Sequence, residues 1–500
     1  MNGASPANSN RVIFRGDASP AIGGGHIMRC MSLADALARR GMEVGFAVSA
    51  ATLETVPALA EASYELILVN PEEPLTDALH EGGWGPGGFL VIDHYEIDAL
   101  QVSACRRHFD HVVVIDDLAR GPHDCDLLIN QGARALGQLY AGNVPCHALV
   151  LAGPQYALLR PDFAKLRNWS MARRRDGKVE RLFVSFGLTD VGGWALFSVL
   201  ALAPKGIMID VAVGSRASTA EALKTVADRH ENVRLHFDAG NVAELMSKAD
   251  LAIGAGGSTS WERCTLGVPT IVAVAAENQR AIAEDLHKTG AARLLEIQDA
   301  GLLSSLVDDL IHDAAAVRHM QECAASICDG AGAERVAEAM ARLGPTNMSQ
   351  VVTIRPSRAE DRADFWLIRN DSSARAASGN PAVVPWGDHV LWWQRALETR
   401  GREMFTAELA GHVIGYVRFD AEQDGVYATS IALAPQYQGC GLGGRILQAG
   451  LDEMTRRHPE ASIIARIQET NIASVRIFQR VGFLEAGLEQ GFRVLRYDRA

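Results

Sequence analysis

Short apolar runs alternate with stretches of helical periodicity along the first two thirds of the chain. Each run, rich in Val, Ile and Leu, predicts a buried strand, and apolar positions three or four residues apart between the runs predict helices. Such alternation is typical of a doubly wound α/β sheet with parallel strands. Within residues 11–165 the predicted strands are 11–14, 43–48, 66–69, 89–92, 112–115 and 127–129.

A second unit with the same alternation covers residues 179–343, after a basic stretch at 173–178 that we interpret as a solvated connector. Its predicted strands are 181–185, 208–213, 233–237, 251–253 and 270–274, its helices are 194–202, 219–230, 242–248 and 282–289, and a helix-rich stretch ends it. We therefore expect two Rossmann-like lobes that hold a ligand in the cleft between them, at the carboxyl ends of the strands.

The pattern changes at residues 344–350, where Gly-Pro and small polar residues predict a linker. Beyond it, residues 351–500 combine a strand at 351–354, helices at 359–369 and 386–398, and a meander at 404–409, 412–419 and 426–433. These elements predict a separate α+β domain. At the other end, the polar residues 1–10 predict a disordered tail.

Composition narrows the class of protein. A chain of 500 residues with 48% hydrophobic residues is long enough for about three domains. The net charge of −12 argues against non-specific nucleic-acid binding but not against a small anionic ligand. The 8 cysteines form neither CxxC pairs nor a zinc-ligand spacing, so we expect reduced thiols, no metal and a cytoplasmic location. No apolar run is long enough for a membrane span, and nothing indicates the oligomeric state.

The stretch GGGHIMR at 23–29 joins the first predicted strand to a helix that runs to about residue 40. Glycines allow a ligand to approach the backbone, and a helix N-terminus attracts anions. The positive end of the helix disfavours an imidazolium, so we expect His26 to be uncharged near pH 7 and able to accept a proton. The stretch indicates a hydrolase or transferase acting on a nucleotide-activated substrate, although a capping role for His26 fits this stretch equally well.

A second glycine-rich loop, GAGGSTSWE at 254–262, follows the predicted strand 251–253. Its small residues would admit a diphosphate, Ser258 and Thr259 could donate hydrogen bonds to it, and Glu262 could accept from ribose hydroxyls. A dinucleotide-binding turn would need a third glycine where Thr259 stands, so that fingerprint fails. The segments 187–190 and 277–279 end neighbouring strands and point to the same cleft, whereas we interpret Gly192 and Gly193 as turn residues.

Seven segments together carry a specific resemblance. They are GGGHIMR (23–29), IDHYEID (92–98), IDDLARGPHDCDLLINQ (115–131), YALLRPDF (156–163), SFGLTD (185–190), GAGGSTSWERCTLGVP (254–269) and AENQ (276–279). In these segments the chain resembles the UDP-2,4-diacetamido-2,4,6-trideoxy-β-L-altropyranose hydrolases of pseudaminic acid biosynthesis. That family is related in fold to the two-lobed glycosyltransferase-B enzymes of MurG type.

The resemblance implies a mechanism in which His26 activates a water that attacks the anomeric carbon with inversion while UDP leaves. One base on the face opposite the leaving group suffices for such a displacement. Tyr95 and Asn278 match active-site positions of the family, and Glu262 matches its uridine-binding glutamate. The predicted substrate-binding set is Gly24, Gly25, Arg29, Asp93, Tyr95, Arg160, Gly187, Thr189, Gly256, Gly257, Ser258, Thr259, Glu262, Glu277, Asn278 and Gln279. His94 and His123 are expected to be structural or substrate-orienting, and Leu188 departs from the glycine expected there.

The C-terminal domain carries a second resemblance. The loop QGCGLG (438–443) matches the Q/R-x-x-G-x-G/A pattern, and NIASVRIF (471–478) with VGF (481–483) matches the second signature, of the GNAT acetyltransferase superfamily. The resemblance implies acetyl-CoA as co-substrate, with its pyrophosphate on the loop amides. The predicted cofactor-binding set is Ile431, Leu433, Gln436, Gln438, Gly439, Gly441, Leu442, Gly443, Asn471, Ser474 and Phe478. Phe478 stands where many members have a tyrosine acid; Tyr427 and Tyr437 are alternative acids, although surface packing is the better interpretation of both.

The segments IRNDSSARAAS (368–378) and WGDHVLWW (386–393) resemble acetyltransferases of nucleotide-linked amino sugars. This implies that the C-terminal domain acetylates the 4-amino group of the UDP-sugar before the two lobes release UDP. Three alternatives stay open: a UDP-sugar glycosyltransferase, an enzyme for a related legionaminic-type precursor, and a non-catalytic nucleotide-sugar sensor fused to a protein acetyltransferase.

Overall fold

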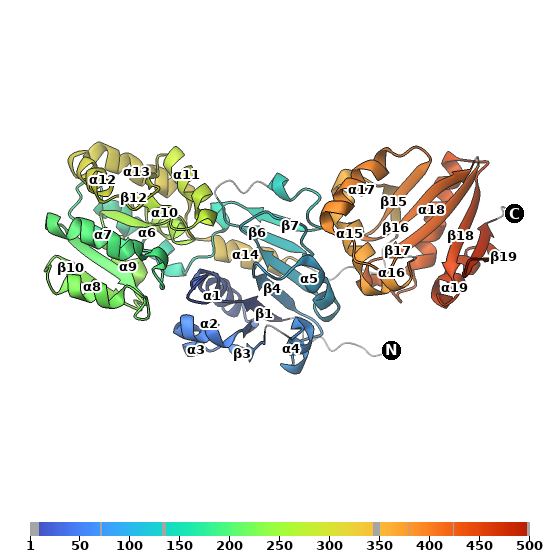
Figure 1. Cartoon of the computed structure of the whole chain (residues 1–500), viewed down its shortest axis with the longest axis horizontal. Coiled ribbons are helices and arrows are strands. Elements are labelled where there is room, and N and C mark those ends of the chain that lie inside the picture. Colours follow the sequence, from blue (N-terminus) through green and yellow to red (C-terminus); the bar gives the residue numbers. More distant parts are fainter. Residues whose placement is uncertain are drawn as a thin grey trace.

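The computed structural model describes residues 10–70, 73–132, 137–343, 351–378, 380–423 and 425–497. The first lobe lies in the middle, with the second lobe on one side and the C-terminal domain on the other (Figure 1). Residues 1–9 of the predicted tail and the predicted linker 344–350 lie outside the described residues. In the described part of the chain, no helix combines the length and the apolar character that crossing a membrane requires.

The first lobe is a parallel sheet with the strand order β3-β2-β1-β4-β5-β6-β7. The strands, in chain order, are β1 (Arg11–Gly16), β2 (Glu43–Val48), β3 (Glu65–Leu68), β4 (Phe89–Asp93), β5 (His111–Ile115), β6 (Leu127–Asn130) and β7 (Leu149–Ala152). The helices between them are α1 (Gly25–Ala38), α2 (Ala50–Thr55), α3 (Pro57–Glu61), α4 (Leu75–Glu81) and α5 (Ala99–Cys105), with the 3-10 turns η1 (Arg106–His108), η2 (Gly137–Tyr140) and η3 (Pro154–Tyr156). The central strands are buried on both faces, which is why they read as continuous apolar runs.

The second lobe is also parallel, with the order β10-β9-β8-β11-β12-β13. Its strands are β8 (Arg181–Ser185), β9 (Met208–Val213), β10 (Val233–Phe237), β11 (Leu251–Ala255), β12 (Thr270–Ala273) and β13 (Ala292–Leu295). The helices of this part of the chain are α6 (Pro161–Arg173), α7 (Trp194–Leu202), α8 (Ala220–Ala227), α9 (Val242–Lys248), α10 (Thr259–Thr265), α11 (Arg280–Lys288), α12 (Ala300–His312), α13 (Ala314–Ile327) and α14 (Gly332–Ala341), with the 3-10 turns η4 (Val191–Gly193), η5 (Ala203–Lys205) and η6 (Glu277–Gln279).

The chain crosses between the lobes twice. After β7 it enters α6, which packs on α9 and α10 of the second lobe. After α13 it returns through α14, which packs on α1 and places Val336 and Met340 in the core of the first lobe. The last helix of the segment predicted as the second lobe therefore belongs structurally to the first lobe, and the two crossings tie the lobes together.

The basic stretch at 173–178 differs from the predicted solvated connector. The Arg174 side chain is buried and donates hydrogen bonds to the carbonyl groups of Ser247, Ala249 and Leu266. Ser247 and Leu266 lie at the ends of α9 and α10, where helix carbonyls lack intrahelical partners. Burial lowers the pKa of Arg174 to about 10, so the guanidinium remains charged at neutral pH. Arg174 thus joins α6 to the second lobe.

The C-terminal domain is built on a mixed sheet with the order β14-β15-β16-β17-β18-β20-β19. Its strands are β14 (Thr353–Pro356), β15 (Arg402–Leu409), β16 (His412–Gln423), β17 (Val426–Leu433), β18 (Ser462–Gln468), β19 (Phe483–Glu489) and β20 (Phe492–Tyr497), and its helices are α15 (Arg362–Asn370), α16 (Ser372–Ala376), α17 (Trp386–Glu398), α18 (Leu442–Arg457) and α19 (Ile472–Arg480), with the 3-10 turns η7 (Ala359–Asp361) and η8 (Pro435–Tyr437).

Helices cover both faces of this sheet. Tyr416 of β16 stacks on Phe365 of α15, at 4.2 Å between ring centroids, while the next residue, Val417, lies against Gly450 of α18. Successive side chains of a strand point to opposite faces, so α15 and α18 lie on opposite sides. The parallel strands β17 and β18 pair only from Val426 to Ala428, which leaves the ends nearest Leu433 unpaired with each other.

The C-terminal domain is docked on the first lobe. Trp366 and Leu367 of α15 form a buried cluster with Ala99 of α5. Arg362 donates to the Asn143 side chain at 2.9 Å, and the Asp364 carboxylate accepts from the backbone N–H of Cys146 at 2.9 Å. The domain is therefore held by a mixed apolar and polar interface.

Candidate active sites

The sheet topology places the predicted site loops at two equivalent points. In the first lobe β1 lies between β2 and β4, and in the second lobe β8 lies between β9 and β11. The strand order reverses at these points, which opens a crevice at the carboxyl ends of the strands. The loop with His26 follows β1, Asp93 ends β4, Gly187 follows β8, and the glycine-rich loop follows β11.

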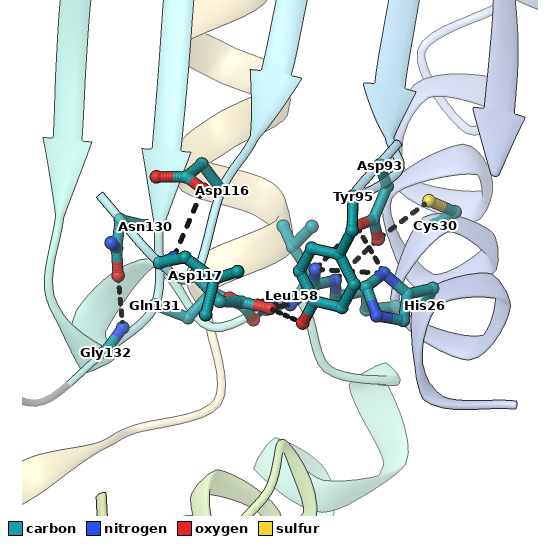
Figure 2. A network of polar contacts seen from close by, with 12 residues as sticks. His26, Cys30, Asp93, Tyr95, Asp116, Asp117, Asn130, Gln131, Gly132 and Leu158 are labelled. Atoms are coloured by element: carbon teal, nitrogen blue, oxygen red, sulfur yellow. Dashed lines mark hydrogen bonds and ion pairs between the residues drawn. The ribbon is translucent and has the colours of Figure 1, made fainter. Parts of the chain in front are cut away.

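His26 lies in the first turn of α1 and rests on a buried carboxylate (Figure 2). Its Nδ1 is 2.6 Å from Oδ1 of Asp93, which is 1% exposed. Arg29, one turn further along α1, donates from Nε and Nη2 to the two oxygens of Asp93, each at 2.6 Å. From Nη1 it also donates to both oxygens of Asp117, at 2.9 and 2.7 Å.

This arrangement determines which nitrogen of His26 is available. Burial alone would raise the pKa of Asp93, but the charge of Arg29 and the contact with His26 outweigh burial and hold that pKa well below its usual range. An ionised carboxylate only accepts hydrogen bonds, so Nδ1 carries a proton and Nε2 is the nitrogen that can accept one. Arg29 and Asp93 were predicted to bind substrate; the structure places both behind His26, where they orient and support its ring.

Tyr95 links His26 to the second lobe. Its ring lies edge-on to that of His26, at 4.7 Å between centroids and 87° between planes. The hydroxyl donates to Asp117 at 3.4 Å and hydrogen-bonds the Asn278 side chain on η6 of the second lobe. Burial and the charge of Asp117 raise the pKa of Tyr95 to about 12, so the phenol stays protonated at neutral pH. Two predicted residues from different lobes thus meet beside His26.

The loop before His26 also meets the loop after β8. A Cβ on Gly24 would lie 2.9 Å from a methyl group of Val56 and 3.2 Å from one of Leu188, so only glycine fits between these side chains. Leu188, the residue where a glycine was expected, packs on the core of the first lobe. A Cβ on Gly23 would lie 3.8 Å from the Thr189 hydroxyl. The structure therefore brings the loop before His26 against the loop after β8.

Glu262 on α10 and Arg160, directly before α6, lie close enough for their charges to interact. Burial raises the pKa of Glu262, and the positive charges of Arg160 and Arg263 oppose that effect. Among the described residues, no side chain donates a hydrogen bond to the Glu262 carboxylate. Arg160, directly before α6, donates to the carbonyl of Gly240 at 3.2 Å. A carboxyl group in this setting would gain from hydroxyl donors on a ligand.

The other predicted residues of the second lobe differ in setting. A Cβ on Gly256 would lie 2.8 Å from the carbonyl oxygen of Gln279, so this glycine serves the contact of its loop with η6. A Cβ on Gly257 would lie 3.6 Å from the side-chain nitrogen of Gln279, an ordinary contact distance. Ser258 directly precedes α10, but its side chain does not cap the helix. The Thr259 hydroxyl accepts a hydrogen bond from Arg263 at 3.3 Å. Glu277 is exposed and pairs with Arg280. A Cβ on Gly25 or on Gly187 would meet nothing within 4 Å, which leaves both open towards their surroundings.

Three acidic residues of the first lobe received no role from the sequence. Asp117 holds both Arg29 and Tyr95. Asp17 contacts Nε2 of His94 at 3.2 Å, and Asp116 lies 3.6 Å from Nε2 of His123. Each of these histidines, expected to be structural or substrate-orienting, therefore has a carboxylate partner. The signal for all three was their position within two residues of the end of a strand. No set of His, Cys, Asp and Glu with the geometry to hold a metal ion occurs among the residues that the structure describes.

The glycine loop of the C-terminal domain begins next to the open end of β17. Gly439 and Gly441 have φ values of 77° and 76°, in the left-handed region that favours glycine, and nothing lies within 4 Å of a Cβ on either. The Gln438 side chain donates to the carbonyl of Leu433 at 3.2 Å. Leu442 and Gly443 begin α18, Ile431 and Leu433 are partly buried at the end of β17, and Gln436 lies on the loop facing the first lobe.

Two residues of the second signature support the fold. Asn471 caps α19 by accepting from the backbone N–H of Ser474 at 3.1 Å. Phe478, predicted to bind the cofactor, is 3% exposed and packs edge-on against Phe483 in the core. Its position on the inner face of α19 explains the difference, because a side chain there meets the sheet instead of the cleft. Tyr427 is partly buried and packs against His458. Tyr437 is buried in the core, so the surface packing preferred for it is wrong.

Two family models match the chain. The acetyltransferase (GNAT) family matches residues 371–483, and the glycosyltransferase family 28 C-terminal domain matches residues 201–342. The first match covers both signatures of the C-terminal domain, and the second covers most of the second lobe. The topology and these matches agree on two Rossmann-like lobes of glycosyltransferase-B type followed by an α+β acetyltransferase domain.

Individual proteins are similar to separate parts of the chain. UDP-2,4-diacetamido-2,4,6-trideoxy-beta-L-altropyranose hydrolase of Campylobacter jejuni is 29% identical over 288 residues, which are 56% of this chain and 97% of that protein. L-Methionine sulfoximine/L-methionine sulfone acetyltransferase of Salmonella typhimurium is 34% identical over 138 residues, 26% of this chain and 80% of that protein. Among solved structures, MurG of Acinetobacter baumannii aligns with a TM-score of 0.47 at 15% identity, over 67% of this chain and 100% of that one.

Proposed function

We propose that this protein is a bifunctional nucleotide-sugar enzyme. Its C-terminal domain belongs to the GNAT family of acetyltransferases. Its two lobes are related to a UDP-sugar hydrolase over nearly the whole length of that enzyme. The lobes hydrolyse UDP-2,4-diacetamido-2,4,6-trideoxy-β-L-altropyranose to UDP and the free sugar, with inversion at the anomeric carbon. The GNAT domain acetylates the 4-amino group of the UDP-amino-sugar precursor with acetyl-CoA. Both steps belong to pseudaminic acid biosynthesis.

The pairing of His26 with Asp93 carries the proposal for hydrolysis. Nε2 of His26 takes a proton from water while the water oxygen bonds to the anomeric carbon. The bond between that carbon and the diphosphate oxygen breaks, and UDP leaves with the electron pair. Asp93 stabilises the positive charge that develops on the ring, and Arg29 keeps Asp93 ionised. Tyr95 and Asn278 border the same space from the two lobes.

Binding of UDP falls to the second lobe in this proposal. The Glu262 carboxylate accepts from the ribose hydroxyls, and the loop at 256–259 meets the diphosphate. Arg160, at the crossing between the lobes, supplies a positive charge on the same side as Glu262. Thr189 and Gly187 border the diphosphate from the loop after β8, and Gln279 from the neighbouring rim.

The experiment is a turnover assay with His26→Ala in the full chain. NMR follows UDP release and the anomeric configuration of the released sugar, and calorimetry measures UDP binding. We expect UDP release to fall by about 10²–10⁴-fold, the range for general-base catalysis, with UDP binding retained. His147→Ala is the matched control, because His147 also rests on a buried aspartate, Asp126, at the other end of the strands. Near-normal turnover by His26→Ala would refute the mechanism.

A glycosyltransferase is the second candidate, because the family model that matches residues 201–342 is of that class. Such an enzyme would transfer the sugar to an acceptor hydroxyl instead of water. Incubation of the protein with UDP-sugar alone separates the two, since only the hydrolase yields stoichiometric free sugar without an acceptor. The same assay, supplied with the UDP-4-amino sugar and acetyl-CoA, reports N-acetylation. A substrate with legionaminic-type stereochemistry tests whether the enzyme acts on that related precursor.

A further inference from the structure

The segment that leads into the glycine loop of the GNAT domain lies on the first lobe. The turn η8 directly precedes Gln438, and it packs against η1 of the first lobe. A small cavity between the two domains is lined by Arg106 and His147 on one side and by Pro435 and Gln436 on the other. The loop that we expect to meet coenzyme A is therefore anchored at a contact between domains.

A chain of polar contacts runs from η1 to the same loop. Arg107 donates from Nη2 to Oδ2 of Asp371 at 3.2 Å. The other oxygen, Oδ1, caps α16 by accepting from the backbone N–H of Ser373 at 3.0 Å and also contacts the Ser373 hydroxyl. That hydroxyl lies 3.0 Å from Oε1 of Gln438. It has one proton and two acceptors, so it donates to Asp371 and to Gln438 in turn.

Gln438 is the point where these contacts reach the loop. Its amide nitrogen donates to the carbonyl of Leu433, at the open end of β17, while its amide oxygen faces Ser373. The side chain therefore spans from β17 to α16. Because the backbone of Gln438 begins the turn through Gly439 and Gly441, fixing this side chain limits the orientations of the following amide groups. Such pre-organisation lowers the entropic cost of binding an anion.

We propose that the first lobe of the hydrolase is part of the coenzyme A site of the GNAT domain, with Arg107 as a positioning residue. Arg107 fixes Asp371, Asp371 fixes the start of α16, and Ser373 on α16 fixes Gln438. The inference rests on the proposed use of acetyl-CoA by the GNAT domain. It gives the docking of the two domains a functional consequence that a flexible linker would not supply.

Removing the charge of Arg107 should have a modest effect on coenzyme A affinity, because this side chain is 49% exposed. Loss of an exposed ion pair of this kind changes a binding constant by about two- to five-fold. The effect should fall on coenzyme A affinity and leave UDP-sugar hydrolysis unchanged, since η1 lies at the start of β5 and the hydrolytic site lies at the carboxyl ends of the strands. High salt should abolish it, because salt screens exposed charges.

The test is calorimetric titration of the full chain with coenzyme A, which needs no acceptor substrate. We expect Arg107→Gln and Ser373→Ala each to raise Kd about two- to five-fold at low salt, and the double variant to raise it no more than the larger single change, because both act through one chain of contacts. Arg107→Lys, which keeps the charge, should restore most of the affinity. Arg39→Gln is the matched control: Arg39 is 48% exposed and pairs with Glu334 away from the GNAT domain.

Each other outcome has a definite meaning. Equal Kd values for wild type, Arg107→Gln and Arg39→Gln would overturn the inference, and so would additive effects of Arg107→Gln and Ser373→Ala. A parallel loss of hydrolysis and thermal stability in Arg107→Gln would also overturn it, by showing a general structural role. A wild-type chain that does not bind coenzyme A would instead refute the proposed acetyl transfer.

Discussion

Replacing Asp93 by Asn tests the carboxylate beneath His26 with a nearly isosteric change. In the wild type Asp93 accepts from Nδ1 of His26 and from two nitrogens of Arg29. An asparagine offers one oxygen and one NH2 group, so it cannot accept from both residues in the same way. An NH2 group facing His26 favours the tautomer with the proton on Nε2. That tautomer cannot take a proton from water at Nε2.

Two magnitudes follow from these contacts. In serine proteases, a change of aspartate to asparagine beneath the catalytic histidine lowers kcat by about 10⁴-fold. We expect a loss of about 10²–10⁴-fold in UDP release here. Removing one partner of a buried ion pair costs about 3–5 kcal/mol, and the cost should lie near the lower value because Arg29 retains Asp117.

The assay measures UDP release and acetyl transfer on the same preparation, with unfolding followed by denaturant titration. Acetyl transfer is the internal control, because the GNAT domain lies on the side of the first lobe opposite the second lobe (Figure 1). Asp126→Asn is the matched variant: Asp126 accepts from Arg106 and His147, both at 3.0 Å, and so resembles Asp93 in its partners. It should lose comparable stability but little hydrolysis per folded molecule.

The reasoning fails if Asp93→Asn is folded and hydrolyses the UDP-sugar at more than about a tenth of the wild-type rate. It also fails if Asp126→Asn loses hydrolysis to the same extent at equal folded fraction, because the loss would then follow from stability alone. A loss confined to Asp93→Asn, with acetyl transfer retained, would support the role of the carboxylate in orienting His26.

Three further predictions concern the GNAT domain and its interface. Gly441→Ala should lower the free energy of unfolding by about 1–2 kcal/mol, because φ is 76° there and alanine is strained in that region. It should also weaken coenzyme A binding in a calorimetric titration without changing hydrolysis. Phe478→Tyr should lower the free energy of unfolding by about 1–3 kcal/mol, since the new hydroxyl enters a core, and a rise in the rate of acetyl transfer would contradict the burial of this side chain. Burial raises the pKa of Asp364 from 3.8 to about 7, so the wild type loses stabilisation as the pH rises across that interval. Asp364→Asn, which can still accept from Cys146, should therefore unfold at a higher temperature than wild type at pH 8 and at a similar one at pH 4; the same difference at both values would exclude Asp364 as the cause.

Much of the secondary structure follows from local sequence alone. The predicted strands 43–48, 181–185, 208–213, 233–237 and 426–433 coincide with β2, β8, β9, β10 and β17. The sequence analysis predicted no strand at β18, β19 or β20 of the C-terminal domain. In the two lobes it missed β7 and β13, and both lie at the edge of a sheet. Edge strands are covered on fewer sides, so their apolar signal is shorter than that of a central strand. The glycine-rich loops and their place after strands were likewise visible in the sequence.

Periodicity and loop motifs are local properties, so the amino-acid order was enough to predict the α/β class. The division into three domains and the residues proposed to carry the chemistry stay predictions. Which of these residues face a ligand depends on the assembled fold. Arg29 meets Asp117 across 88 positions and Arg107 meets Asp371 across 264, and neither partner can be read from local sequence. The same holds for Phe478, α14 and Arg174, whose burial depends on elements far away in the chain. Burial and charge pairing arise only when distant segments come together, and in this chain they make Asp93 a support for His26.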